Sequence, residues 1–305
     1  MWPTFIIIGA QRSGTTSLYH YMRQHPDVHM SPVKETNFFA IDDRMPALEE
    51  RTVFKTSVSD VPSYRALFEE GDGKQALGEA SPAYLNAEDA PKRMAQCVPH
   101  AKLIAVLRNP IDRAYSRFLQ AQLKGREDHD TFEEALDKEA QLLERGAWKY
   151  WEHGFVPYLD GGMYAKHLER YWAHYPKDQV GVWLYDDLRQ DAASVCAEVF
   201  EFIGVDPSYE VQTERYNASG VPKNAWLDRA IRAGRNAAPS VKRLVRQWMP
   251  DSLYSHVRSA HNRNFEKPQM KSGTRAQLAE VFRPDVERLG QLLGRDLSHW
   301  LAPQP

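Results

Sequence analysis

Short runs of apolar residues alternate along this chain with longer stretches in which apolar residues recur at helical spacing. The short runs lie at residues 4–8, 75–78, 103–107 and 180–184 and are typical of buried strands. Helical stretches separate them, and this alternation is typical of strands that pair in a parallel sheet. The pattern therefore predicts an α/β protein whose ligands gather at the carboxyl ends of the strands.

Three later stretches are also predicted to be helical. Residues 130–149 have an amphipathic pattern with acidic and basic residues alternating on the outer side, and residues 162–175 and 267–301 show helical spacing. An aromatic cluster follows the first stretch, at Trp148, Tyr150, Trp151 and Phe155. Such rings belong either to the core or to the lining of a sugar or hydrophobic acceptor site.

The first strand candidate leads into a turn bounded by Gly9 and Gly14, after which a helix is expected. Such a turn directs backbone N–H groups and the positive end of a helix toward one point, where an anion can bind. The glycine spacing is that of the nucleotide-triphosphate P-loop, but Thr15 stands where that motif requires lysine, and the cation is Arg12. The turn is therefore predicted to hold a phosphate of a ligand other than ATP. The alternative is a turn whose Ser and Thr residues only cap the helix.

A second strand candidate ends at Arg108 and is followed by a helix start. Asn109 suits the N-cap and Pro110 the first helical position. Ser116 lies seven residues beyond Asn109, so it returns to the face of the helix that looks toward the cap. Arginine can bind a phosphate through two hydrogen bonds, and serine adds a neutral donor. This segment is a second candidate phosphate site; an ordinary strand–helix junction with a surface arginine is the alternative.

A carboxylate with a neighbouring cation follows the first predicted helix. Glu35 comes directly after Lys34 and precedes two aromatic residues. Activation of an acceptor hydroxyl requires a base, and a carboxylate can act as one when partial burial raises its pKa from roughly 4.3 toward neutrality. Glu35 is therefore the candidate base, and a solvated Lys34–Glu35 pair is the alternative.

Together these segments resemble the sulfotransferases that use 3′-phosphoadenosine-5′-phosphosulfate (PAPS). Gln11-Arg12-Ser13-Gly14-Thr15-Thr16 resembles their 5′-phosphosulfate loop, and Leu-Arg-Asn-Pro-x-x-Arg-x-x-Ser at residues 107–116 resembles their 3′-phosphate motif. Lys-Glu-x-x-Phe-Phe at residues 34–39 resembles the stretch with the catalytic glutamate in the heparan-sulfate and bacterial branch of the family. The resemblance implies a P-loop-like three-layer fold with a central parallel sheet flanked by helices.

By this resemblance, the six loop residues bind the donor, and Arg108 and Ser116 bind its 3′-phosphate. Lys223, in a late turn-rich loop, is expected to close over the donor, although a plain exposed loop explains it equally well. Glu79 follows a predicted strand and belongs to a segment that resembles the lining of the family's acceptor cleft, which makes it a candidate substrate contact. A capped helix start at Ser81 is the alternative for that segment.

The resemblance implies in-line transfer of a sulfonate group from PAPS to a hydroxyl or amine, with release of adenosine 3′,5′-bisphosphate (PAP) and without a metal. Arg12 would offset negative charge on the leaving group, and Glu35 would take the acceptor proton. Lys34 would orient Glu35 or contact the sulfonate. Histidine is the alternative base, at His20, His25 or His29. The other functions considered are a P-loop kinase or NTPase, which would need lysine after Gly14, and a nucleotide-binding protein without catalysis.

Composition limits the organisation of the chain. Its 305 residues, 42% of them hydrophobic, are long enough for one large α/β domain, which we expect over residues 1–305. The most basic part is predicted to be helical, at about residues 224–265, and is either a lid-like segment over the donor or a solvated helical face.

The net charge and the cysteine content limit the binding partners and the cellular compartment that we expect. The net charge of −2 gives no general attraction for nucleic acid or an anionic membrane, so an anionic donor must be attracted locally. Cys97 and Cys196 lack metal-ligand spacing, which favours a reducing compartment. The apolar start at residues 5–8 is too short to span a membrane, and we expect a cytoplasmic protein. The expected acceptor is a small molecule or a carbohydrate; its identity and the oligomeric state are left open.

Overall fold

The computed structural model describes residues 1–41, 57–144, 158–213, 221–222, 265–266 and 268–303. The chain forms two compact units, Met1–Glu214 with Lys271–Pro305, and Arg215–Met270. Within the second unit, β6 (Val221–Pro222) pairs antiparallel with β7 (Phe265–Glu266). Lys223, the segment 224–265 apart from β7, and the aromatic cluster at 148–155 lie outside the described residues. The single domain with a lid-like segment stays a prediction.

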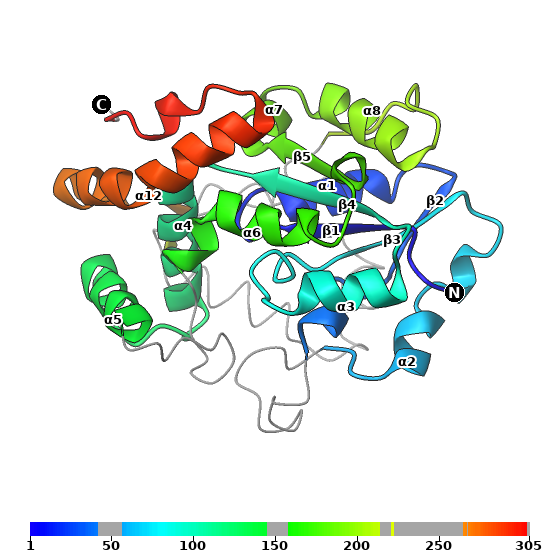
Figure 1. Cartoon of the computed structure of the whole chain (residues 1–305), viewed down its shortest axis with the longest axis horizontal. Coiled ribbons are helices and arrows are strands. Elements are labelled where there is room, and N and C mark those ends of the chain that lie inside the picture. The colour runs from blue at the N-terminus through cyan, green and yellow to red at the C-terminus, as the bar shows by residue number, and fades with distance from the viewer. Residues whose placement is uncertain (42–56, 145–157, 214–220, 223–264, 267, 304–305) are drawn as a thin grey trace, which may run out of the picture. The chain divides into compact units, whose positions relative to one another are not determined.

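Five parallel strands form the central sheet of the first unit, in the order β2-β3-β1-β4-β5 (Figure 1). Their bounds are β1 Phe5–Gly9, β2 Val28–Met30, β3 Ala76–Ala80, β4 Lys102–Leu107 and β5 Val180–Leu184. Every residue of β1 and β3 is buried, as expected for the middle of a parallel sheet covered on both faces. Four strands confirm the predicted runs. Strand β2 was not predicted, because three residues carry too little pattern.

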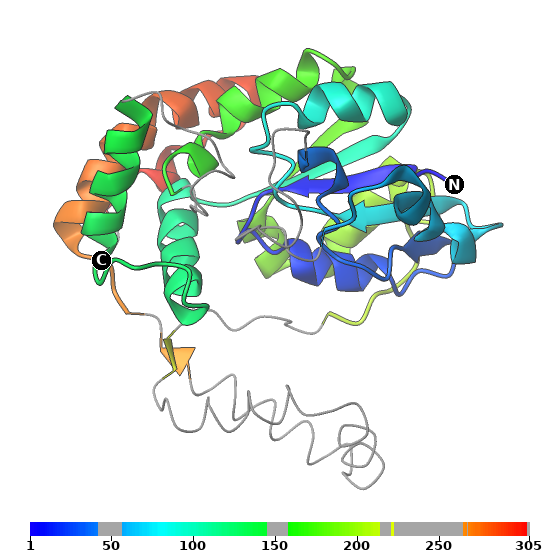
Figure 2. The ribbon, with the colours of Figure 1, turned by 90° about the horizontal axis from the view of Figure 1, so that it is seen from below.

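Helices cover both faces of the sheet and complete the predicted three layers. Helix α1 packs with α8 on one side, while α3 packs with α6, and α6 with α12, on the other (Figure 2). The helices are α1 Thr15–Met22, α2 Val61–Ala66, α3 Ala90–Cys97, α4 Pro110–Leu123, α5 Phe132–Glu144, α6 Tyr164–Trp172, α7 Tyr185–Gln190, α8 Ala192–Ile203 and α12 Ser272–Leu293. In the described part of the chain, none of the helices combines the length and the apolar character needed to cross a membrane.

The predicted cap of the helix that follows Arg108 is confirmed. The Asn109 side chain accepts hydrogen bonds from the N–H groups of Ile111 and Asp112, over 3.0 and 3.3 Å, and so caps α4. The predicted C-terminal helix is shorter than expected. It ends at Leu293, where Gly294, with a left-handed φ of 63°, forms the C-cap, and a short 3₁₀ turn (Ser298–Trp300) follows.

Candidate active site

The loop after β1 lies at a switch point of the sheet, because β1 has β3 on one side and β4 on the other. Ligands of parallel sheets gather at such points. Gly14 is the N-cap of α1 and has a φ of 87°, which glycine adopts at little cost. Arg12 also has a positive φ, 69°, a conformation that is costly for arginine and that clusters at functional sites. The backbone thus forms the predicted tight turn between strand and helix.

The predicted donor-loop residues line this turn. Ser13 and Thr15 are buried, whereas Gln11 and Thr16 are half-buried. The Ser13 hydroxyl is fully enclosed and adjoins the Tyr164 hydroxyl, whose pKa it acts to lower.

The two predicted phosphate segments meet, although 104 residues separate Arg12 from Ser116. Arg12 Nε donates to Ser116 Oγ over 3.0 Å. Arg108 donates from one amino group to the carbonyl oxygen of Arg12 over 3.2 Å. The Arg108 guanidinium lies 4.9 Å from the centroid of the Tyr185 ring, within range of a cation–π interaction. The structure thus brings the three predicted residues together and adds Tyr185, which the sequence analysis did not select.

Positive charge is concentrated around Arg12. Burial, together with the charges of Arg117 and Arg108, lowers the pKa of Arg12 to about 10. The guanidinium stays protonated at neutral pH, but its charge is unfavourable until an anion lies near it. Arg117 was also missed by the sequence analysis, because only the position of α4 in the fold brings its charge near the loop. The arrangement is that of an anion-binding site.

Glu35 lies beside the end of β3, in a turn that precedes a short 3₁₀ helix (Phe38–Ala40). Its N–H donates to the Ala80 carbonyl over 2.9 Å, and its carboxylate pairs with Lys34 Nζ over 2.9 Å. The Glu35 side chain is 59% exposed and that of Lys34 is 19% exposed. The structure therefore pairs Lys34 with the candidate base.

The expected rise in the pKa of Glu35 is wrong for this structure. Burial acts to raise the pKa, but the charges of Lys34, Lys124 and Arg117 outweigh it, so the pKa lies below its ordinary value. Lys124, which follows α4, was not selected from the sequence. The cations around Glu35 keep it ionised at neutral pH, and an ionised carboxylate is the form that accepts a proton.

Two of the three candidate histidines bond to backbone carbonyls. His25 is buried, and its Nε2 lies 3.0 Å from the Asp206 carbonyl oxygen. His29 Nε2 lies 3.0 Å from the Leu67 carbonyl oxygen. The ring of His20 packs edge-on against Tyr19. The contacts of His25 and His29 indicate structural roles.

The prediction that Glu79 contacts the substrate is wrong for this structure. The Glu79 side chain is completely buried, and both carboxylate oxygens accept hydrogen bonds from side-chain hydroxyls. The alternative of a helix start at Ser81 is also wrong, because residues 82–86 form turns. A sequence does not show which face of a strand end is enclosed, so it could not assign this carboxylate to the interior.

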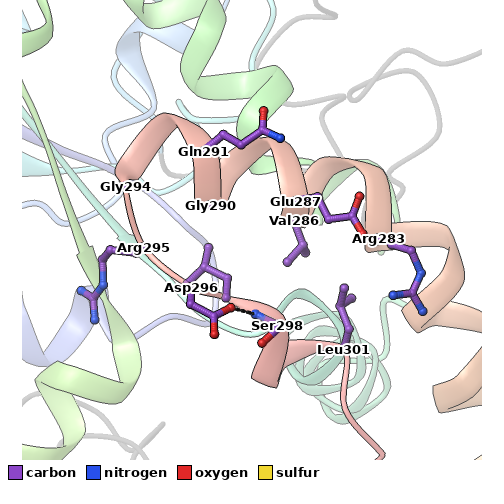
Figure 3. A pocket seen from close by; sticks show the side chains of 11 residues that line it. Arg283, Val286, Glu287, Gly290, Gln291, Gly294, Arg295, Asp296, Ser298 and Leu301 are labelled. Atoms are coloured by element: carbon purple, nitrogen blue, oxygen red, sulfur yellow. Dashed lines mark hydrogen bonds between the residues drawn. The ribbon is translucent and has the colours of Figure 1, made fainter.

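A surface pocket lies at the end of α12 (Figure 3). Arg283 and Arg295 line it, and both are engaged in ion pairs, with Glu280 and Asp187 respectively. None of the predicted site residues is among those that line it. The pocket is therefore not part of the candidate active site.

Known proteins resemble this chain along almost its whole length. The chain is 31% identical to mouse "Bifunctional heparan sulfate N-deacetylase/N-sulfotransferase 4" over 99% of its own length. It spans only 31% of that relative. It is 27% identical to mouse "Heparan sulfate glucosamine 3-O-sulfotransferase 3B1", over 97% of this chain and 64% of that protein.

The crystal structure of a sulfotransferase from Alicyclobacillus acidocaldarius has a similar fold. Its TM-score is 0.71 at 28% sequence identity, and the alignment covers 99% of this chain and 100% of that one. These matches lend no support to a P-loop kinase or NTPase. Residues 3–290 match the family model described as "Sulfotransferase domain". This match spans the donor loop, the Arg108 segment and Glu35, and on these grounds the chain belongs to the sulfotransferase family.

Proposed function

We propose that this chain transfers a sulfonate group from PAPS to a hydroxyl or amine of a carbohydrate or small-molecule acceptor and releases PAP. The observation that carries the proposal is the direct contact of Arg12 with Ser116 and Arg108. Two segments that resemble the 5′-phosphosulfate and 3′-phosphate motifs meet at one positively charged centre. A nucleotide with anionic groups at both its 5′ and 3′ positions fits such a centre better than a nucleotide with phosphates at one end.

The residues around this centre fit the donor. The amino end of α1 would offer hydrogen-bond donors to the 5′-phosphosulfate, together with Gln11, Ser13, Thr15 and Thr16. Arg108, oriented by the Tyr185 ring, and Ser116 would hold the 3′-phosphate. Lys223 remains a predicted clamp outside the described residues.

Arg12 has the main electrostatic role in the reaction. As the acceptor oxygen bonds to sulfur, the bond from sulfur to the bridging oxygen breaks, and its electron pair remains on the 5′-phosphate of PAP. Arg12 and the positive end of the α1 dipole would offset this negative charge. Arginine stays protonated throughout, so it acts by charge and does not donate a proton.

Glu35 is the proposed base, and binding of the donor would raise its pKa. Without a donor, Lys34, Lys124 and Arg117 hold its pKa low, which makes it a weak base. Phosphate and sulfonate groups beside these cations offset their charge, so the pKa of Glu35 rises toward its ordinary value. The carboxylate then accepts the proton that the acceptor hydroxyl loses as it attacks sulfur.

A carbohydrate is the favoured acceptor class. The two mouse relatives are named for heparan sulfate and for its glucosamine residues. The exposed Glu35 side chain is compatible with an acceptor that reaches the base from solvent. Cytoplasmic residence stays a prediction from the sequence.

The test is incubation of the purified chain with PAPS and a panel of acceptors, comprising desulfated heparan-type glycans and hydroxylated metabolites. Mass spectrometry would follow both the release of PAP and the gain of a sulfonate group on the acceptor. We expect both products in equal amounts with at least one glycan. The proposal would be refuted if the protein bound neither PAPS nor PAP but bound ATP with magnesium.

A pair of variants tests the base separately. Glu35→Gln should lose sulfonate transfer and keep its affinity for PAP, because Glu35 accepts a proton but does not hold the donor. Glu70→Gln, at an exposed carboxylate, is the matched control and should keep both. Unchanged transfer by Glu35→Gln would remove Glu35 from the mechanism.

A further inference from the structure

We propose that Glu79 is a positioning residue that holds the turn bearing Glu35 in its active conformation. This inference rests on the proposed role of Glu35 as the base. Glu79 lies in β3, one residue before the carbonyl of Ala80 that accepts the Glu35 N–H. Its side chain is completely buried and therefore cannot touch a substrate.

Four hydroxyl groups surround the Glu79 carboxylate. Oε1 accepts from Tyr64 over 2.8 Å and from Tyr84 over 2.7 Å. Oε2 accepts from Thr36 over 2.9 Å and from Ser81 over 2.7 Å. A buried carboxylate is costly unless it is well hydrogen-bonded, and this one is bonded entirely by neutral donors. Core packing alone does not explain a buried carboxylate with this desolvation cost.

The two residues that donate to Oε2, Thr36 and Ser81, connect the Glu79 carboxylate with the backbone around Glu35. Thr36 is its chain neighbour, and Ser81 Oγ accepts the N–H of Asn37 over 3.1 Å. The Asn37 side chain in turn donates to the Glu35 carbonyl oxygen over 2.7 Å. The backbone that follows the Glu35 Cα is therefore tied to the Glu79 carboxylate, and the Glu35 N–H is held by the carbonyl of the next residue in β3, Ala80.

The turn needs such support because its backbone is unfavourable. Glu35 has a φ of 64° and Asn37 a φ of 51°, in the left-handed region that residues with a Cβ rarely adopt. Asparagine tolerates this region, but glutamate has no such preference. Conformations of this kind persist only where surrounding contacts over-determine them, and here those contacts converge on Glu79.

The cluster offers a matched pair of variants. Thr36→Val and Tyr64→Phe each remove one buried hydroxyl from Glu79 and conserve the shape of the side chain. Thr36 belongs to the Glu35 turn, whereas Tyr64 lies in α2. A cluster that only stabilises the core would respond similarly to both changes. A positioning cluster would respond differently in catalysis.

The first measurement compares kcat for sulfonate transfer, KM for PAPS and the Kd for PAP. We expect Thr36→Val to lower kcat by about tenfold or more, because a displaced base loses its alignment, with KM and Kd within about twofold of wild type. Tyr64→Phe should keep kcat within about twofold. Equal losses of kcat in the two variants, or an unchanged kcat in Thr36→Val, would overturn the proposal.

The second measurement does not depend on activity. Carbon-13 NMR of the Glu35 carboxyl group, assigned with Glu35→Gln, follows its titration. In Thr36→Val the pKa of Glu35 should rise, because the displaced side chain moves away from its neighbouring cations, and it should not change in Tyr64→Phe. If wild type transfers no sulfonate, the proposed function fails, while this titration still decides the positioning role. A pKa of Glu35 that is the same in all three proteins would refute that role.

Discussion

Replacement of Arg12 by glutamine is expected to abolish donor binding without destabilising the ligand-free protein. Arg12 is a half-buried cation beside Arg108 and Arg117, and these surroundings lower its pKa to about 10. Because the folded-state pKa lies below that of the unfolded chain, the charged form is penalised by folding at every pH below about 10. Removal of the charge at neutral pH therefore relieves an unfavourable interaction.

The magnitude follows from the pKa of Arg12. At about 1.4 kcal/mol per pKa unit, the lowered value corresponds to roughly 3 kcal/mol against the charged form. Screening by water at a half-buried side chain reduces this to about 1–2 kcal/mol. Loss of the hydrogen bond to Ser116 offsets about 1 kcal/mol. The free energy of unfolding of Arg12→Gln should thus equal that of wild type or exceed it by up to about 1 kcal/mol, equivalent to up to about 2 °C in Tm.

The assay is thermal unfolding at neutral pH with and without PAP. At a PAP concentration of about 100 times Kd, bound ligand should add about 2.7 kcal/mol to wild type, or roughly 5 °C. Arg12→Gln should lose this shift. Arg189→Gln, at an exposed arginine, is the control and should keep it. A ligand-free Tm for Arg12→Gln more than about 2 °C below wild type, or a retained PAP shift, would show that the electrostatic reasoning is wrong.

Three further predictions concern the same site. Lys34→Met should raise the pKa of Glu35, since it removes a cation that lowers it, so the acidic limb of the kcat/KM profile should move to higher pH; a profile that does not move would contradict the pairing. Arg108→Ala should weaken PAP binding by about 1.5–3 kcal/mol, or about ten- to hundredfold in a calorimetric Kd, and an unchanged Kd would exclude Arg108 from the phosphate site. Gly14→Ala should lower both Tm and PAP affinity, because φ is 87° and a Cβ would lie 3.0 Å from side-chain atoms of the neighbouring α7; wild-type values for both would argue against the turn geometry.

The sequence by itself determined the local structure of this protein and the chemistry of its two phosphate segments. The glycine-bounded turn, the Asn109 cap and the strands that lead into them depend on neighbouring residues, so the rules of backbone conformation predict them. The starts of α1 and α4 and four of the five strands were predicted for this reason. The order of the motifs along the chain was sufficient to identify the family resemblance.

The tertiary structure decided which side chains are in contact and how their charges shift the pKa values of neighbouring groups. The contact of Arg12 with Ser116, the positions of Arg117 and Lys124 near the site, and the burial of Glu79 join segments far apart in the chain. The direction in which the pKa of Glu35 shifts also depends on residues far away in the chain, Lys124 and Arg117. A pKa is the balance of desolvation against every nearby charge, and these charges come from elements whose packing no local pattern records. The sequence therefore located the candidate base, whereas only the fold determined its protonation.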